Sequence, residues 1–215
     1  MKTRVVALAL TLSLGFAAPA RASTQVTLVN SGTVTAFGYY VGPYNGIMGA
    51  PVNGNVMLNC VDFFHHAADG DIWQANLTNL GSSAGIGTAT RFNNLTAYRQ
   101  AAWLTTQYAT TSNAASIGDI QATIWNLFSG TTTPPQPSTN SWLLASQAYV
   151  AANPNGSAYQ GFWVVSDVNT YNPDGTDNVN SRQEFIITTP EPASMLLFGT
   201  GLAGLAIARP RRKRK

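Results

Sequence analysis

The central part of this sequence has very little positive charge. The 215-residue chain contains 12 lysines and arginines, but nine of them lie in its first 22 or its last 26 residues. Residues 23–189 keep only Arg91, Arg99 and Arg182 against eight acidic residues, so the net charge of this segment is −5. A surface without a basic patch is a poor match for a phosphate backbone, and the composition therefore argues against nucleic acid as a partner.

The first 22 residues have the organisation of a secretory signal peptide. A short basic start precedes an apolar run that ends at Pro19. Ala20 and Ala22 then supply the small residues that a signal-peptide cleavage site requires. We predict cleavage between Ala22 and Ser23, which leaves residues 23–189 as one domain long enough for a sizeable core.

The other end of the chain has three parts. Pro190-Glu191-Pro192 is followed by an uncharged apolar run over 193–208 and then by a terminal cluster of arginines and lysines. A helix over this run would span about 24 Å, slightly less than a hydrocarbon core of about 30 Å. The basic end should stay in the cytoplasm, with the body of the protein outside.

These three parts closely resemble the PEP-CTERM sorting signal of Gram-negative bacteria. The resemblance implies an exosortase-type membrane protease as a partner and a transmembrane helix that anchors the protein until the tail is removed. It also implies release to the cell surface or the extracellular matrix. The alternative interpretation of the same residues is an ordinary C-terminal membrane anchor.

Residues 23–189 contain strand patterns on either side of helix patterns. Expected strands, from alternation or short apolar runs, are 25–29, 33–41, 55–64, 72–77, 161–165 and 184–188, with a loop at 43–54. Expected helices are about 95–108, 115–128 and 141–152, with Asn93 or Asn94 as the first N-cap. This order predicts an α+β fold, in which an antiparallel sheet or sandwich carries an inserted helical subdomain of about three helices.

Cysteine is nearly absent, because Cys60 is the only one in the chain. A single cysteine in an exported protein has no intramolecular disulfide partner. It is therefore a small core residue, a link between chains or a reactive thiol.

Gln121 is an unusual residue for its place in the second expected helix. It shares a helical row with Trp125 and Phe128, next to an apolar row, so its amide points at the core or its rim. Burying an amide without partners costs about 1–3 kcal/mol. Attack of the Cys60 thiolate on the Gln121 carboxamide, with loss of ammonia, would account for both residues. We therefore predict an intramolecular thioester between Cys60 and Gln121.

The residues around this pair resemble the thioester domains at the tips of bacterial surface adhesins. Ile120-Gln121-Ala122-Thr123-Ile124-Trp125 is similar to their Thr-Gln-X-Ala-Ile-Trp motif, and Cys60-Val61-Asp62 is similar to their cysteine motif. Ala101-Ala102-Trp103-Leu104 is similar to the helix that lies between them. The sequence departs from the motif at Ile120 and Thr123, where threonine and alanine are usual. The resemblance covers about residues 55–130.

This resemblance implies an adhesion protein that is not an enzyme and needs no cofactor. Its partner would be an amine-bearing surface or matrix macromolecule, captured covalently through an amine or a hydroxyl group. The thioester has to be kept from water until that target arrives. We expect the shielding and orienting groups among five side chains: Asp62, Phe63, Trp103, Tyr108 and Trp125.

Other functions stay open at this point. The five tryptophans and eight tyrosines could line the groove of a non-covalent matrix-binding or carbohydrate-binding module, or the protein could be structural. A Cys60 nucleophile with His65 or His66 would make a papain-like hydrolase, but histidines so close in sequence to the cysteine fit poorly with a dyad assembled by the fold. The same three residues lack a fourth spaced ligand, so we expect no metal site.

Overall fold

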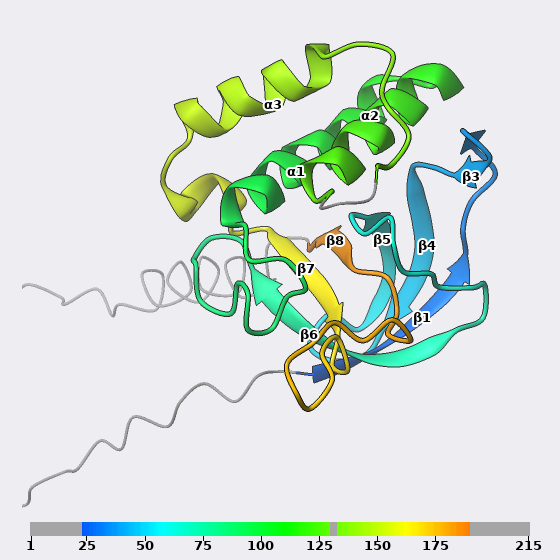
Figure 1. The fold of residues 1–215 in the computed structure, drawn as a ribbon, viewed down its shortest axis with the longest axis vertical. Coiled ribbons are helices and arrows are strands. Elements are labelled where there is room, and N and C mark those ends of the chain that lie inside the picture. The colour runs from blue at the N-terminus through cyan, green and yellow to red at the C-terminus, as the bar shows by residue number, and fades with distance from the viewer. Residues whose placement is uncertain (1–22, 130–132, 190–215) are drawn as a thin grey trace, which may run out of the picture.

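A computed structural model of the chain describes residues 23–129 and 133–189 (Figure 1). The predicted signal peptide and the predicted sorting tail lie outside these residues, and Ser23 is the first residue of the first strand. Six antiparallel strands close into a barrel in the order β1-β4-β5-β8-β7-β6. They are β1 Ser23–Asn30, β4 Pro43–Met48, β5 Gly54–Cys60, β6 Ile72–Asn79, β7 Phe162–Asp167 and β8 Phe185–Thr188. The mixed architecture with an antiparallel sheet is confirmed, but the sheet closes on itself and is not a sandwich.

The barrel core follows from the alternation of its strands. Successive side chains of a strand point to opposite faces, so one set lies inside a closed sheet and the other faces water. In β1, the side chains of Thr24, Val26 and Leu28 are buried, whereas Gln25, which lies between Thr24 and Val26, is exposed. In β5, Leu58 is fully buried and its neighbour Met57 is exposed.

Strand β4 occupies part of the segment that was expected to be a loop, and this prediction was wrong. Pro43 and Gly46 were interpreted as chain breakers. Pro43 is the first residue of the strand, a position where its missing N–H group is tolerated. At Gly46, an added Cβ would lie 2.5 Å from Cδ1 of Leu58, so glycine is what lets Leu58 fill the barrel at this point.

The expected strand over 33–41 is instead a short hairpin, β2 Thr35–Ala36 and β3 Tyr39–Tyr40. Phe37 and Gly38 connect the two strands with φ values of 57° and 83°. Two consecutive residues with positive φ make the tight turn that matches the twist of an antiparallel pair. The hairpin packs on a helix, where an added Cβ at Gly118 would lie 2.7 Å from Cβ of Ala36.

The three predicted helices are confirmed, and all of them lie between β6 and β7 in the chain. They are α1 Leu95–Gln107, α2 Ala114–Leu127 and α3 Ser141–Ala152, with short 3-10 turns η1 Tyr108–Thr110 and η2 Gly156–Tyr159. The side chain of Asn94 accepts a hydrogen bond from the Ala97 N–H group and begins α1. The helices lie together over one end of the barrel (Figure 1). Across residues 23–129 and 133–189, no helix combines the length and the apolar character that crossing a membrane requires.

Candidate functional site

The side chain of Gln121 reaches the main chain of Cys60 where the barrel touches α2. Cys60 is the last residue of β5, and Gln121 lies in the middle of α2. Both residues are fully buried. Nε2 of Gln121 donates a hydrogen bond of 2.8 Å to the main-chain oxygen of Cys60. The structure therefore brings together the two residues on which the sequence interpretation depends.

The carbonyl oxygen of the Gln121 side chain faces two hydrogen-bond donors. The hydroxyl group of Tyr108 lies 2.9 Å from Oε1, and the main-chain N–H group of Gly42 lies 3.4 Å from it. These bonds and the one to Cys60 satisfy the buried amide, so its burial carries no unpaired polar group. Two donors on a carbonyl oxygen are also the arrangement that stabilises negative charge on that oxygen during acyl transfer.

The sulfur atom of Cys60 has two polar neighbours. The indole N–H group of Trp125 points at Sγ over 3.5 Å, and the thiol donates to the main-chain oxygen of Asp62 over 3.2 Å. Burial raises the pKa of the Cys60 thiol to about 12, and the hydrogen bond from Trp125 offsets only part of this effect. A free Cys60 would therefore be protonated and weakly reactive at neutral pH.

Three aromatic rings cover this pair on the side of the β2–β3 hairpin. The ring centres of Phe63 and Trp125 are 5.0 Å apart, and Tyr39 lies 5.2 Å from Phe63 and 5.9 Å from Trp125. Phe63 and Trp125 were expected as shielding groups, whereas Tyr39 was not expected. Trp103 lies elsewhere, stacked on Tyr149 at 5.6 Å between α1 and α3.

A cavity of about 360 Å³ lies beside the covering rings. Tyr39, Tyr40, Phe63 and Trp125 line it, together with the polar side chains of residues such as Gln183. Trp125 thus belongs both to the cavity wall and to the surroundings of the Cys60 sulfur. Neither Cys60 nor Gln121 lines the cavity itself, so Trp125 is the side chain that links the cavity to the pair.

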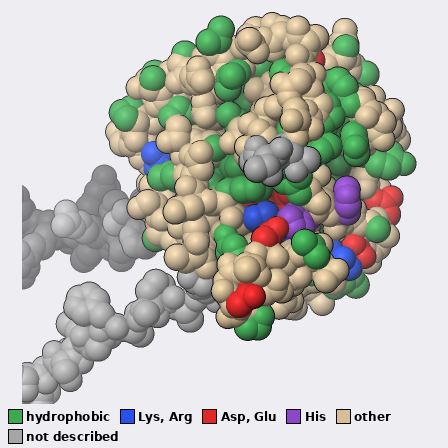
Figure 2. All heavy atoms as spheres, in the orientation of Figure 1, with side chains coloured by type: hydrophobic (Ala, Val, Ile, Leu, Met, Phe, Trp, Pro, Cys, Tyr) green, Lys and Arg blue, Asp and Glu red, His purple; other side chains and the backbone are tan. Residues whose placement is uncertain are grey.

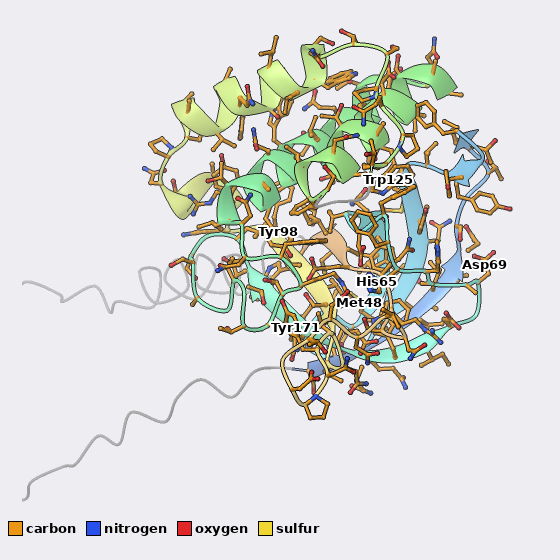
Figure 3. All side chains as sticks on the ribbon, in the orientation of Figure 1. Met48, His65, Asp69, Tyr98, Trp125 and Tyr171 are labelled. Carbon is orange, nitrogen blue, oxygen red and sulfur yellow. The ribbon has the colours of Figure 1, made fainter. Side chains whose placement is uncertain are left out.

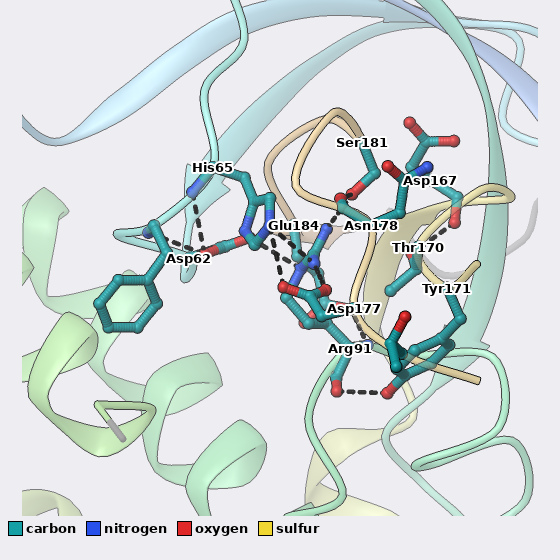
Figure 4. Close-up of polar contacts among 12 residues, drawn as sticks. Asp62, His65, Arg91, Asp167, Thr170, Tyr171, Asp177, Asn178, Ser181 and Glu184 are labelled. Atoms are coloured by element: carbon teal, nitrogen blue, oxygen red, sulfur yellow. Dashed lines mark hydrogen bonds and ion pairs between the residues drawn. The ribbon is translucent and has the colours of Figure 1, made fainter. Parts of the chain in front are cut away.

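A cluster of charged side chains surrounds Asp62, two positions after Cys60 in the chain (Figure 4). Oδ2 of Asp62 is 2.8 Å from Nδ1 of His65 and 2.9 Å from Nε of Arg91. Nε2 of His65 lies 3.0 Å from Nη1 of Arg91 and 3.1 Å from Oδ2 of Asp177, and Arg91 also pairs with Asp177. In the space-filling view, histidine, arginine and acidic side chains gather on the face below the helices (Figure 2).

This cluster joins three segments that are far apart in the chain: the exit of β5, the segment before α1 and the connection from β7 to β8. Asp62 was expected as a group that shields or orients the thioester; its carboxylate pairs with His65 and Arg91. His65 lies in the bend that follows β5, and its ring is buried between charged partners, which the sequence did not predict. Arg91 and Asp177 were missed, since no local pattern links residues 86 positions apart.

Glu184 extends the same buried network to the start of β8. One of its oxygens, Oε1, accepts from the Arg91 N–H group at 2.7 Å and from the Ser166 hydroxyl at 2.5 Å. The Tyr98 hydroxyl donates to the other oxygen. Burial raises the pKa of Glu184 to about 7, partly offset by these hydrogen bonds. The Glu184 main-chain oxygen accepts from the Val61 N–H group at 3.0 Å, so the network also fixes the residue next to Cys60.

The two histidines are not arranged around the cysteine as a hydrolase would require. His65 is held by Asp62 and Arg91, and His66 is exposed on the wall of the cavity. Among the hydrogen bonds of residues 23–129 and 133–189, the Cys60 sulfur is joined to Trp125 and Asp62 and to neither histidine. The same part of the chain holds no group of three or more histidine, cysteine, aspartate or glutamate residues suited to a metal ion.

Comparison with known proteins identifies one segment of the chain. Residues 188–213 match the PEP-CTERM protein-sorting motif. No curated protein and no solved structure matches the chain. The motif marks an exported, extracellular surface protein that an exosortase sorts and that is anchored in the membrane before it is processed.

Proposed function

We propose that this exosortase-sorted protein stores an intramolecular thioester between Cys60 and Gln121 and uses it once to capture a nucleophile at a bacterial surface or matrix. The observation that carries the proposal is the 2.8 Å hydrogen bond from Nε2 of Gln121 to the Cys60 main-chain oxygen, which holds the carboxamide at the residue that carries the only thiol of the protein. A Gram-negative host and an amine-bearing macromolecule as target belong to the same proposal.

Bond formation joins these two side chains; because burial keeps the thiol protonated, its proton has to move to the amide nitrogen as the sulfur attacks. Sγ of Cys60 attacks Cδ of Gln121, the new C–S bond forms and the C–N bond breaks. The amide nitrogen leaves as ammonia and takes the thiol proton with it. Negative charge develops on Oε1 in the tetrahedral intermediate, where Tyr108 and the Gly42 N–H group are in place to stabilise it. No oxidant and no energy source are consumed.

In the capture step, an amine displaces the sulfur from the acyl group, whereas in bond formation the sulfur displaces ammonia. An amine attacks the Cδ carbonyl carbon of residue 121, a C–N bond forms, and the C–S bond breaks. One proton of the amine ends on the departing sulfur, which the Trp125 indole N–H group faces. The thiol pKa of about 12 keeps the released sulfur protonated, which disfavours the back reaction. Each molecule reacts once, so the protein acts as a covalent adhesin without turnover.

The side chain of Gln121 has hydrogen-bond partners on both its oxygen and its nitrogen despite the two departures from the thioester-domain motif. Ile120 is fully buried and Thr123 donates from its hydroxyl group to the Asp119 main-chain oxygen at 2.7 Å. A threonine hydroxyl that bonds within its own helix needs no other partner. Both substitutions are therefore compatible with the hydrogen bonds around Gln121.

Labelling with methylamine tests the proposal at the level of the residue. The purified protein is incubated with methylamine, digested and analysed by peptide mass spectrometry, and the adduct is expected at Gln121. Gln107, an amide on α1, provides an internal control and should stay unlabelled. Cys60→Ala and Gln121→Asn should abolish the adduct. Labelling of Gln121 that persists in Cys60→Ala would contradict the proposal.

A further inference from the structure

The cavity beside the Cys60–Gln121 pair has the properties of a cation-binding site. We propose that it binds an organic ammonium group, so that the nucleophile captured by this protein is part of a positively charged ligand. The capture step of this inference rests on the proposed function. The binding site itself does not, because the aromatic cavity is present whether or not the thioester forms.

Aromatic rings make up much of the wall of this cavity. Tyr39 and Tyr40 are 42% and 52% exposed, so part of each ring is available to a ligand. The ring planes of Tyr39 and Phe63 meet at 71°, and those of Tyr39 and Trp125 meet at 79°. The three rings pack against one another at these angles, and all three also line the cavity, where the free part of an aromatic face attracts an ammonium group.

The charge around the cavity has the sign that a cation requires. Among the described residues, none of the three arginines lines the cavity, and residues 23–189 contain no lysine. Ser31, which does line it, binds Oδ1 of Asp69 through both its N–H group at 2.9 Å and its hydroxyl at 2.7 Å. This fixes a carboxylate close to the rim, on the side of the molecule that carries the hairpin (Figure 3).

Two residues of the cavity wall link the cavity to the Cys60 sulfur: Trp125 by direct contact, and Gln183 through a shared hydrogen-bond acceptor. The Trp125 ring faces the cavity, and its N–H group points at Sγ of Cys60. Gln183 also lines the cavity and donates to the Asp62 main-chain oxygen at 3.4 Å, the atom that accepts the Cys60 thiol. A ligand held against Trp125 is therefore separated from the Cys60 sulfur by that side chain.

A carbohydrate is the competing ligand for a wall of aromatic rings. Sugars stack on the flat face of a ring, and several rings in one plane would favour a glycan chain. The rings here are set edge to face, and an acidic body favours a cation over a neutral sugar. We therefore place an ammonium group in the cavity.

Binding is tested first in Cys60→Ala, which has no thiol and cannot form the thioester. Tetramethylammonium chloride, titrated at constant ionic strength, should produce a saturable change in tryptophan fluorescence. The change should be lost in Cys60→Ala/Phe63→Leu and kept in Cys60→Ala/Trp103→Leu, a matched control because Trp103 lies between α1 and α3. No saturation, equal responses from the two double variants, or a stronger response to glucose than to the cation would overturn the proposal.

Aminolysis of the unmodified protein tests the link to capture. At equal low concentration, cadaverine should react about ten-fold faster than aminopentanol of the same length, since about 1.4 kcal/mol of cation binding corresponds to that ratio. Tetramethylammonium should slow cadaverine and leave aminopentanol unaffected. Equal rates for the two amines would overturn the cation site while leaving covalent capture in place. If neither amine reacts, the proposed thioester fails, and a positive fluorescence titration would still support the cation site.

Discussion

The side-chain amide of Gln121 lies 2.8 Å from the main-chain oxygen of Cys60, although 61 positions separate the two residues. Cys60 ends a strand that pairs with β8 through Phe185, and Gln121 projects from a helix that lies over the end of the barrel. Neither element alone determines the contact. The contact between the Gln121 side chain and the Cys60 main chain depends on the closed barrel and on how α2 packs against it.

Tyr108→Phe should slow both formation and aminolysis of the thioester. The substitution keeps the buried ring but removes the hydroxyl that donates to Oε1 of Gln121 at 2.9 Å. Loss of one oxyanion donor costs about 10²- to 10³-fold in acyl-transfer reactions. The rate of methylamine incorporation, followed by mass spectrometry, measures the effect. Tyr149→Phe on α3 is the matched control and should react at the wild-type rate; an unchanged rate for Tyr108→Phe would remove Tyr108 from the mechanism.

Reaction with methylamine should lower the melting temperature. A bond from Cys60 to Gln121 closes a loop of about 62 residues, and the chain-entropy treatment of cross-links assigns such a loop about 4 kcal/mol. For a domain of this size that corresponds to roughly 10 °C. Calorimetry before and after treatment measures the difference. Cys60→Ala should melt at the same temperature with and without methylamine, and identical curves for treated and untreated wild type would count against a preformed bond.

After methylamine treatment, the released Cys60 should resist alkylation while the protein is folded. Burial raises the pKa of this thiol to about 12, so only a very small fraction is thiolate at pH 8. Iodoacetamide should label Cys60 slowly under native conditions and rapidly in denaturant. Untreated protein should yield no label in brief exposure to denaturant, because its sulfur is acylated. Rapid labelling of the folded, treated protein would show that the sulfur is accessible and ionised.

Glu184 should make the folded protein less stable as the pH rises from about 4.5 to about 7. Its folded pKa is raised to about 7 from an ordinary value of 4.5, so the native state holds a proton that the unfolded state has lost over this window. The contribution is fully present below the unfolded pKa and disappears above the folded pKa, and it amounts to roughly 3 kcal/mol. Melting temperatures measured across this window should fall more steeply for wild type than for Glu184→Gln.

The control for this pH dependence is Asp119→Asn, which removes an acid on α2 outside the Glu184 network. It should keep the wild-type slope. A Glu184→Gln protein whose stability changes with pH as steeply as the wild type would show that Glu184 is already ionised throughout this window.

The helices could be predicted from the sequence because their signals are local. Asn94 caps α1, apolar residues repeat at helical spacing, and Pro154 follows the end of α3. The need of the Gln121 amide for hydrogen-bond partners could also be predicted from the local sequence, since this glutamine lies in an apolar helical row. Of the two groups that donate to its oxygen, Tyr108 was expected near the site and Gly42 was not.

The parts that could not be predicted depend on contacts between distant segments. Strand β4 was missed because Gly46 is a poor strand residue in isolation, and its value lies in the space it leaves for Leu58. The charged cluster was missed because Arg91 reaches residues on both sides of it in the chain, Asp62 and Asp177. Closure of the sheet into a barrel likewise depends on the pairing of β1 with β6, which no single segment specifies.

The most direct test of the thioester is the intact mass of the purified protein, prepared without amine buffers and measured before any nucleophile is added. A preformed thioester gives a mass one ammonia lower than the mass calculated from the sequence of the same processed chain. Cys60→Ala should show its full calculated mass. A wild-type protein that also shows its full mass, with a thiol that reacts in denaturant, would contradict the thioester.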